Sequence, residues 1–440
     1  MIAGSRHTNR PTDAPPELDA PVGIVGAGIT GLAIHHELAE RDVDSVVFEK
    51  RPEPGGVVRS IPHDGTVLET GPQRTRLTKT VRTAITAAGV EDSLLTARDK
   101  PTHVYREGSL RVIPTTIVEA IRTDLLSWRG KARLLLEPLT GRPRPGESVA
   151  EFLERTLGPE TATYLGAPLY AGLYGSDPNR MPVEYSLSKA LERFDASDSL
   201  VKAALRARLR RRDPPPMVTL ERGLQSLPVA LADRYADSVR LETTVQEILP
   251  ANSGYRLQTA DRSTLVEQVV LTTPASSTAS ILSDVDSFSA NALEQLQYNS
   301  LVVVHLEAEA ELHGAGCQLP FESPFRTLGI TWNDSLFDRE RIYTSYLGGA
   351  KAPAVVEWSE DRLGRCAAIE FETITGAEAE PINVTRLRPG MPAYDDSWRS
   401  LDDVEPPPGI TLCANYESRS GIPGRLRQAG QVAEMIADQG

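Results

Sequence analysis

The regular pattern of the chain begins with an apolar run at residues 22–25. A glycine-rich turn follows, and then a stretch to Arg41 whose apolar positions recur with helical spacing. A second run of branched apolar residues begins at Ser45 and ends at Glu49. Strand, helix and strand in this order predict a βαβ unit near the start of the chain.

Residues 112–217 are predicted to be largely helical. Apolar side chains at Ile117, Ile121 and Leu125 are spaced for one face of a helix. Prolines punctuate this block near its middle and at its end. From Met217 onward the pattern changes to short runs of branched and aromatic residues, which favours strands.

The remaining elements are mostly strands framed by two helices. One helix is predicted over residues 224–235, and a closing helix runs from Pro423 or Gly424 to Asp438. The strands predicted between them cover residues 239–248, 255–259, 268–273, 301–307, 330–332, 342–346 and 410–413. This mixture predicts the α/β fold class, and the sequence contains no visible repeat.

Length and composition indicate a globular protein of several domains. With 440 residues, two or three domains are expected, and 40% hydrophobic with 24% charged residues excludes wholesale disorder. A net charge of −13 disfavours nucleic acid as a partner, because binding to phosphates requires a positive field. The one basic run, Arg206–Arg212, is expected to be a solvated helix end. No stretch approaches the length of a membrane span, so we expect a cytoplasmic protein that is at most peripheral to a membrane.

Cysteine and histidine spacing predicts no metal site. The three cysteines are far apart and form no C-x-x-C pair, which fits a reducing compartment; they are Cys317, Cys366 and Cys413. His35 and His36 are adjacent, so on a helix they point to different faces. Residues 1–20 lack the apolar core of a signal peptide and are expected to be a disordered tail.

The turn after the first strand matches the pattern G-x-G-x-x-G. Its residues are Gly26, Ala27, Gly28, Ile29, Thr30 and Gly31. The pattern alone is weak, but here a strand precedes it, a helix follows it, and Glu49 ends the next strand at the expected distance. The first glycine allows a tight turn, the second lets a diphosphate approach, and the third permits close helix packing, while the acid can bind ribose hydroxyls. A plain turn is the alternative; we interpret the unit as a dinucleotide site.

FAD rather than NAD is indicated by the residues that follow Glu49. A second glycine pair, Gly55–Gly56, comes directly after it, and the run Glu69-Thr70-Gly71-Pro72 comes next. This arrangement resembles the flavin-dependent amine oxidase superfamily, and within it the protoporphyrinogen/coproporphyrinogen oxidase family. Further segments resemble that family in order and spacing: 148–153, 157–160, 168–178, 221–228, 347–350, 392–394 and 412–423.

The resemblance implies a three-part organisation. A Rossmann-like FAD-binding domain would be built from residues 20–100, 218–280 and 402–440, with a helical insertion at 111–217 and a mixed-sheet substrate-binding domain at 281–401. The FAD would be held non-covalently, since no His or Cys stands in an attachment motif. Besides the six residues of the glycine turn, the implied FAD-binding residues are Glu49, Lys50, Gly55, Gly56, Val57, Arg59, Gly71, Pro72, Gln73, Arg74, Val245, Asn415, Ser420, Gly421 and Ile422. Among these, Val245 would contact the adenine through its backbone.

The resemblance also implies how a substrate is placed. Gly172 would direct its carbonyl toward the reacting methylene bridge, although it can also be read as a glycine that ends a helix. Lys79 aligns with a lysine that binds substrate carboxylates in some bacterial members, and an ordinary surface lysine is the alternative; Arg74 and Arg76 are nearby cations. A helix N-terminus near Ile422 would face the N1/O2 edge of the flavin. No side-chain base is visible in the sequence. The reaction does not demand one, since the flavin carries the chemistry.

Four positions depart from the family. Ala414, Glu53 and Arg419 replace a glycine, an arginine and a glycine, and Thr102 stands where mitochondrial-type members have an arginine for the substrate carboxylate. Residues 117–136 fall in the region that forms the mouth of the substrate channel and touches membranes in the family, and a helix packed on its own domain is the alternative.

The sequence therefore predicts an FAD-dependent oxidoreductase. Its expected reaction is oxidation of a porphyrinogen, protoporphyrinogen IX or coproporphyrinogen III, to the porphyrin in haem biosynthesis, with oxygen as acceptor and the small tetrapyrrole as its partner. One alternative is another amine oxidase or a carotenoid-type desaturase. A second is a degenerate flavin-binding protein without catalysis, which the departures at Glu53, Ala414 and Arg419 motivate.

Overall fold

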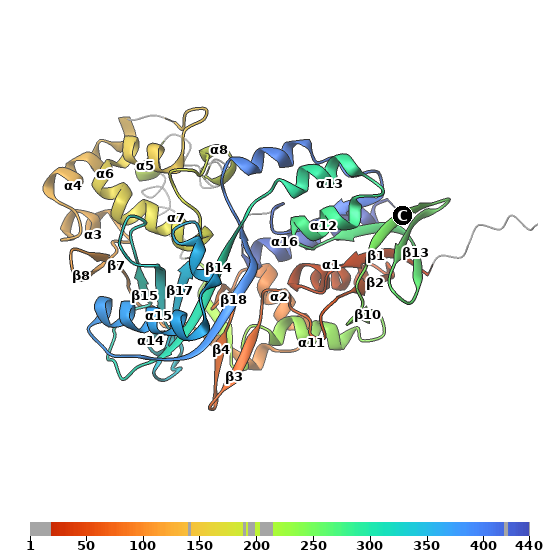
Figure 1. Ribbon diagram of the computed structural model, residues 1–440, viewed down its shortest axis with the longest axis horizontal. Coiled ribbons are helices and arrows are strands. Elements are labelled where there is room, and N and C mark those ends of the chain that lie inside the picture. Colours follow the sequence, from red (N-terminus) through yellow and green to blue (C-terminus); the bar gives the residue numbers. More distant parts are fainter. Residues whose placement is uncertain are drawn as a thin grey trace, which may run out of the picture.

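The computed structural model describes residues 19–139, 142–187, 191, 199–202, 214–417 and 421–439. The predicted tail at 1–18 and the basic run at 206–212 lie outside these residues. Figure 1 shows two lobes side by side: one contains the first sheet with two long helices packed on it, and the other contains a second sheet covered by a block of short helices.

The first sheet has a parallel half. Strand β1 (Ala20–Val25) lies between β2 (Ser45–Phe48) and β13 (Ser263–Leu271), and β10 (Val239–Arg240) and β19 (Ile410–Leu412) extend this part in the same direction. β12 (Gly254–Gln258) and β11 (Glu247–Ala251) add antiparallel strands beside the first half of β13. The four residues of β2 are all buried, as expected for a strand covered on both faces.

Two helices pack together on one face of this sheet. Helix α1 (Ile29–Ala39) follows β1, and α16 (Ile422–Ala437) follows β19; they make extensive mutual contact. Because β1 and β19 both run parallel to β13, both helices begin at the carboxyl edge of the sheet. The fold thereby brings the N-termini of α1 and α16 to the same edge, where ligands bind in sheets of this kind.

The second sheet lies in the other lobe. Its strand order is β18 (Glu380–Pro392), β14 (Tyr298–Glu307), β17 (Ile342–Gly348), β16 (Thr327–Trp332), β15 (Gly316–Gln318), β7 (Thr102–Arg106) and β8 (Ser109–Val112). All neighbours are antiparallel except β15 and β7. Helix α15 (Glu360–Thr375) covers one face, where Tyr343 and Leu347 join its apolar residues in a buried core. Successive residues alternate between faces, so Thr344 and Tyr346 belong to the opposite one.

Short helices cover the opposite side of this lobe in Figure 1. They are α3 (Ile117–Arg122), α4 (Trp128–Leu135), α5 (Val149–Leu157), α6 (Pro159–Thr161), α7 (Ala167–Tyr174) and α8 (Val183–Ser186). A capping box starts α5, since Ser148 and Glu151 bond each other's backbone amides. Among the described residues the other α-helices and strands are α2 (Lys79–Ala88), α11 (Ser226–Arg234), α12 (Ala275–Leu282), α13 (Ser287–Glu294), α14 (Asn333–Phe337), β3 (Ser60–His63), β4 (Thr66–Glu69), β5 (Thr75–Arg76), β6 (Leu94–Thr96) and β9 (Met217–Leu220).

A buried carboxylate joins the two lobes at the end of β4. Glu69 accepts hydrogen bonds from the Ser60 hydroxyl (2.6 Å), the Leu224 amide (2.9 Å) and the Thr219 hydroxyl (3.2 Å), and it lies 3.5 Å from the Arg339 guanidinium. Burial raises the pKa of Glu69, while the hydroxyl of Ser60 and the charge of Arg339 oppose that rise. One side chain thus ties β4 to the turn after β9 and to the segment after α14.

Two predicted elements are corrected. The strand expected over residues 239–248 is two short strands, because Glu242 takes a left-handed conformation (φ +52°) and residues 241–246 form a loop. The suggestion that Gly172 ends its helix is also wrong: α7 continues to Tyr174, and Gly175 (φ +59°) follows it. The βαβ unit, the helix over 224–235 and the closing helix are confirmed, the last beginning at Ile422.

Candidate active site

The glycine turn between β1 and α1 leaves no room for side chains. Gly26 adopts φ +108° and donates its amide to the Phe48 carbonyl at 2.7 Å. A Cβ added at Gly31 would lie 2.0 Å from the Gly26 carbonyl oxygen, closer than any real contact. The turn therefore requires glycine at both positions, as the sequence pattern predicts.

A second glycine turn meets the first. The Gly55 amide donates to the Ala27 carbonyl at 2.8 Å, and Gly28 pairs with Gly55 in an isolated parallel bridge. Gly56 takes a left-handed conformation (φ +63°), and a Cβ added there would be 3.4 Å from the Gly28 Cα. Two stretches of bare backbone thus face each other at the start of α1.

The N-terminus of α1 has unused donors. Gly28 is its N-cap and offers no side-chain hydrogen bond, and the first turn contains no acidic residue. The amides of Ile29, Thr30 and Gly31 lie in the first turn, where a helix provides no acceptor for them. Together with the helix dipole, these donors suit a diphosphate.

Glu49 is held over this turn. Its carboxylate accepts from the Ala27 amide and from the Arg51 amide, each at 2.9 Å, and the residue is only 8% exposed. The next residue, Lys50, is exposed. Glu49 thus lies beside the glycine turn at the position where a carboxylate can bind ribose hydroxyls.

The loop that interrupts the predicted strand brings Val245 to the same edge. The Thr243 amide donates to the Glu49 carbonyl at 2.8 Å, which anchors the loop beside β2. Val245 is 4% exposed, and its own backbone amide and carbonyl make no hydrogen bond within the described residues. A buried peptide group with both polar atoms available suits the edge of an adenine ring.

The segment after the second glycine turn runs along the boundary of the two lobes. A Cβ at Gly71 would lie 1.9 Å from the Val57 carbonyl oxygen, so the backbone at Gly71 is in direct contact with the backbone at Val57. Gln73 is buried and fixed by both ends of its amide: it donates to the Glu69 carbonyl at 2.6 Å and accepts from the Thr344 hydroxyl at 3.2 Å. Pro72 between them is half-buried.

Two arginines of this segment have different surroundings. Arg59 forms an ion pair with Glu53 at 2.7 Å, so the acid that departs from the family pattern engages an arginine assigned to the cofactor. Arg74 is half-buried, and burial lowers its pKa, while the nearby Tyr346 phenol opposes that change. Arg74 therefore lies on the side of the second sheet that faces away from α15.

The C-terminal segment completes the edge of the first sheet. Asn415 accepts a hydrogen bond from the Tyr298 hydroxyl at 3.0 Å, and Gly421 is the N-cap of α16 without a side-chain hydrogen bond. Ile422, the first residue of the helix, is buried. Arg419 and Ser420, which the sequence analysis singled out, lie outside the described residues.

The second sheet contributes polar groups on the face opposite α15. A Cβ added at Gly172 would have one neighbour within 4 Å, the amide nitrogen of Gln318 at 4.0 Å, so space is open beside this residue. Buried side-chain atoms without a hydrogen-bond partner include Gln318 Oε1, Asn333 Oδ1 and His305 Nδ1. Unpaired buried polar atoms are uncommon in proteins, and several on one face favour a ligand there. No sequence pattern marks these residues, because only the tertiary fold brings them to one face.

Lys79 occupies a different setting. It is the first residue of α2, it is exposed, and α2 packs against α11 and α16. Thr78 caps the helix by accepting from the Val81 amide. The structure thus places Lys79 on the surface of the first lobe, while Arg74 lies against the second.

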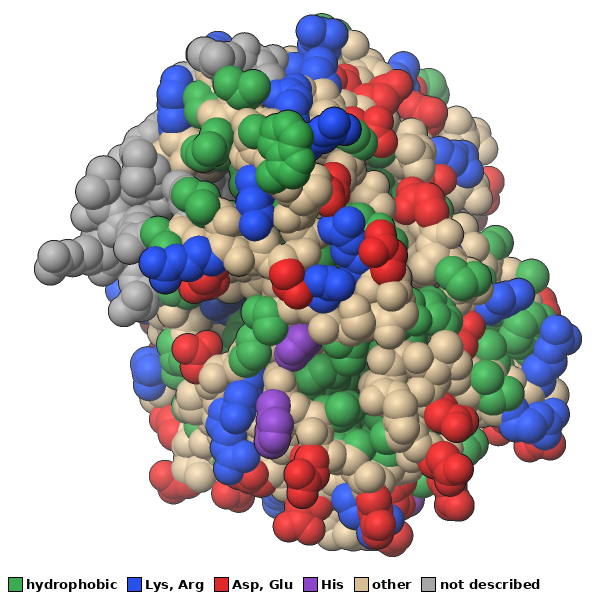
Figure 2. Space-filling model, turned by 90° about the vertical axis from the view of Figure 1, so that its left-hand side faces the viewer, with side chains coloured by type: hydrophobic (Ala, Val, Ile, Leu, Met, Phe, Trp, Pro, Cys, Tyr) green, Lys and Arg blue, Asp and Glu red, His purple; other side chains and the backbone are tan. Residues whose placement is uncertain are grey.

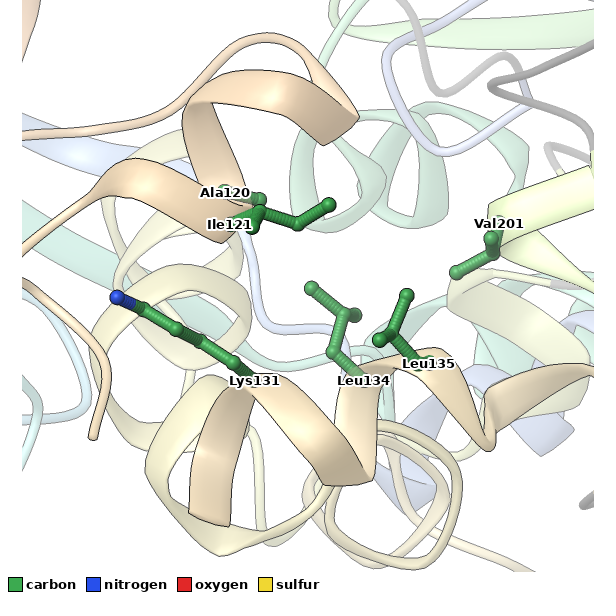
Figure 3. A pocket seen from close by; sticks show the side chains of 6 residues that line it. All are labelled: Ala120, Ile121, Lys131, Leu134, Leu135 and Val201. Atoms are coloured by element: carbon green, nitrogen blue, oxygen red, sulfur yellow. The ribbon is translucent and has the colours of Figure 1, made fainter. Parts of the chain in front are cut away.

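The helical block exposes apolar side chains among cations. Trp128 is 73% exposed, and Ile121 and Leu135 are also exposed. A small apolar pocket lies between α3 and α4; Figure 3 shows its lining residues, which are Ala120, Ile121, Lys131, Leu134, Leu135 and Val201. Figure 2 shows apolar, basic and acidic side chains interspersed over the face that includes this block. In the part of the chain that the structure describes, no helix is both long and apolar enough to cross a membrane.

These features fit FAD. The two glycine turns form a cradle that side chains would fill, the uncapped α1 supplies donors for a diphosphate, and Glu49 and Val245 lie where ribose and adenine would follow. The isoalloxazine ring would then extend toward the N-terminus of α16 and the polar face of the second sheet.

Comparison with known proteins also indicates a flavin-binding protein. The sequence profile described as "Flavin containing amine oxidoreductase" matches residues 29–437. Protoporphyrinogen oxidase 2 of Arabidopsis thaliana is 24% identical over 94% of this chain and 93% of its own length. Coproporphyrinogen III oxidase of Bacillus subtilis is 24% identical over 85% of this chain and 87% of its own. The crystal structure of a proposed protoporphyrinogen oxidase from Exiguobacterium superposes with a TM-score of 0.80 at 24% identity and covers 96% of this chain and 99% of its own.

Substitution of Gly28 tests the cradle. The position has φ −71°, so Gly28→Val imposes no backbone strain, but its side chain fills the space beside Gly56. We expect a folded protein that has lost its FAD, seen as loss of flavin absorbance per mole of protein with a retained thermal transition. Gly430→Ala on α16, away from the turn, is the matched control and should keep its flavin. Normal flavin content in Gly28→Val would contradict the assignment.

Proposed function

The chain belongs to the family of flavin containing amine oxidoreductases, and from this membership we propose that it oxidises a porphyrinogen to the porphyrin. The substrate is protoporphyrinogen IX or coproporphyrinogen III, the electrons pass through FAD to oxygen, and the product serves haem biosynthesis. The observation that supports the proposal most is the likeness, over nearly the whole length of both chains, to enzymes named for this reaction.

The reaction removes six hydrogens from the macrocycle. Over three rounds, three hydrides leave methylene bridges; of the three accompanying protons, two leave ring nitrogens in the net change and one leaves the remaining bridge. When bound, FAD accepts the hydride at N5 and delivers the two electrons to oxygen, which takes up two protons and becomes hydrogen peroxide. The aromatic stability of the product drives the later rounds, so the protein's part is to orient the substrate and exclude water.

Gly172 supports the placement of the substrate. It lies in the last turn of α7, where carbonyl groups have no acceptor role within the helix and are free to bind a ligand. The absence of a side chain keeps the space beside Gln318 open for a broad ring. In the proposed mechanism the carbonyl of Gly172 orients the methylene bridge that loses a hydride.

The carboxylates of the substrate require a cation, and two residues of one segment can supply it. Lys79 follows the Gly71–Pro72 turn and is exposed, which leaves its ammonium group available. Arg74 is half-buried near Tyr346, on the polar face of the second sheet. We propose Lys79 as the partner of a propionate and keep Arg74 as the alternative.

A second function has a specific observation in its favour. The ion pair between Glu53 and Arg59 engages a residue that would otherwise contact the cofactor. A flavin-binding protein without turnover is therefore the alternative to an oxidase, and another amine oxidase is a further one. An assay with several substrates separates all three.

The porphyrinogen assay is the direct test. Purified protein is incubated in air with protoporphyrinogen IX, with coproporphyrinogen III or with benzylamine, and porphyrin fluorescence and peroxide are recorded. We expect porphyrin to form from one or both porphyrinogens, with about three equivalents of peroxide per porphyrin as the electron balance requires. Peroxide from the amine alone would identify an amine oxidase, and no turnover of any substrate would favour the non-catalytic alternative.

Substitution of Lys79 tests the carboxylate site. Loss of a charge-assisted contact costs about 1.5–3 kcal/mol, so Lys79→Ala should lower kcat/KM by roughly tenfold to a hundredfold. FAD content and Tm should not change, because Lys79 is exposed. Arg82→Ala, an exposed cation on the same helix, is the control and should be normal. If Lys79→Ala turns over normally while Arg74→Ala is impaired, Arg74 binds the carboxylate instead.

We also propose that the helical block contacts membranes peripherally. Exposed apolar residues of α3 and α4 alternate with Lys131 and Arg129, a combination that suits the surface of an anionic bilayer. Binding of this kind weakens with salt, because salt screens the attraction between the basic side chains and the anionic lipids.

Sedimentation with vesicles checks this contact. The protein should sediment with phosphatidylserine-containing vesicles at low salt and be released at high salt, and Trp128→Ser should reduce the bound fraction severalfold. Phe288→Ser removes an equally exposed apolar side chain from α13 in the other lobe and should bind as the unchanged protein does. Equal binding by all three proteins would rule out the helical block as the contact.

A further inference from the structure

A buried arginine lies at the start of α16, and no ion pair to it is formed by the part of the chain that the structure describes. Arg425 is the fourth residue of this helix and is 7% exposed. One guanidinium nitrogen, Nη1, donates to the Ala414 carbonyl, while the other, Nη2, is buried and has no partner. Among the residues that the structure describes, no carboxylate forms an ion pair with Arg425.

This arrangement is costly for the protein alone. Moving a charge out of water without a partner is among the most unfavourable changes in folding. Burial accordingly lowers the pKa of Arg425, and the nearby Cys413, Tyr394 and Glu417 only oppose that change. A guanidinium with a spare buried donor therefore favours an anionic ligand beside it.

The helix itself adds to the positive potential. Gly421 offers no side-chain cap, and the first turn of α16 contains no acidic residue. Two of the neighbouring polar groups are neutral: the Tyr298 hydroxyl donates to Asn415 at 3.0 Å and accepts from the Ala275 amide at 3.1 Å. Helix dipole and guanidinium thus act together on whatever occupies this end of the sheet.

The position of α16 indicates which part of the cofactor lies there. Its N-terminus is at the same edge as that of α1, and packed helices lie about 8–10 Å apart. The diphosphate belongs at α1, between the two glycine turns. The ring half of FAD, which continues from the diphosphate, is the part that can reach α16.

We propose that Arg425 stabilises the negative charge of the reduced flavin. When bound and reduced, FAD would carry its surplus negative charge at the N1–C2=O edge of the ring. Arg425 and the N-terminus of α16 would then lie toward that charge and would raise the reduction potential of the flavin. Arg425 acts on the cofactor whatever the substrate is, so the inference depends on FAD and not on the identity of the porphyrinogen.

Sulfite provides a test that is independent of turnover. It adds to oxidised flavin at N5 and leaves a negative charge at the same N1 edge, so its affinity reports the local potential. Titration of FAD-loaded Arg425→Gln should show sulfite binding weakened by about tenfold to a hundredfold, the usual effect of removing one charge-assisted contact. The two-electron reduction potential should fall in parallel, by about 30 mV for each tenfold. Arg427→Gln, an exposed arginine on the same helix, should match the unchanged protein.

A second variant keeps the outcome decisive. Arg425→Lys retains the charge, so it should bind sulfite nearly as the unchanged protein does, even if Arg425→Gln is poorly loaded with FAD. Unchanged sulfite affinity and potential in Arg425→Gln would overturn the proposal and leave Arg425 as a structural donor to Ala414. Loss of FAD from both variants with Tm retained would also overturn it, since the arginine would then serve the diphosphate.

Discussion

The contact between two bare stretches of backbone, the Gly26–Gly31 turn and the Gly55–Gly56 turn, constrains everything around it. The Gly55 amide donates to the Ala27 carbonyl at 2.8 Å, and a methyl group at Gly56 would lie 3.4 Å from the Gly28 Cα, so the two turns leave little room for side chains between them. The contact holds the start of α1 open and uncapped, and it aligns Glu49 beside it. A site for a diphosphate is thereby built from the chain path itself, before any charged side chain is considered.

The second lobe is held to this site through buried polar contacts. Burial lowers the pKa of His305 to about 4, so the ring is neutral at physiological pH. Its Nε2 then carries the proton and donates to the Glu69 carbonyl at 3.0 Å. The carboxylate of Glu69 bonds in turn to Ser60 and to the Leu224 amide. Because each of these groups is costly to leave unpaired, the polar face of the second sheet is fixed against the edge of the first.

What could be read from the sequence was local. The glycine turn and Glu49 are contiguous with strong apolar runs, and the βαβ unit they predict is present. The strand predicted over 239–248 failed because a single left-handed residue, Glu242, turns the chain back toward β2, and a hydrophobicity pattern does not record that conformation. The roles of Gln318 and Arg425 depend on which strands and helices become neighbours, so no sequence motif predicts these roles. For the substrate, the sequence offered Lys79 by resemblance with Arg74 and Arg76 as nearby alternatives, and the fold adds that Arg74 lies near Tyr346 of β17.

We propose that a porphyrinogen delivers electrons directly to FAD in this site, and anaerobic flavin reduction is the most direct test. With oxygen excluded, protein carrying its flavin is mixed rapidly with protoporphyrinogen IX, coproporphyrinogen III or benzylamine while flavin absorbance is followed. We expect at least one porphyrinogen to bleach the oxidised flavin as porphyrin absorbance rises, and the amine to leave it unchanged. Bleaching by the amine alone, or by none of the three compounds, would contradict this proposal.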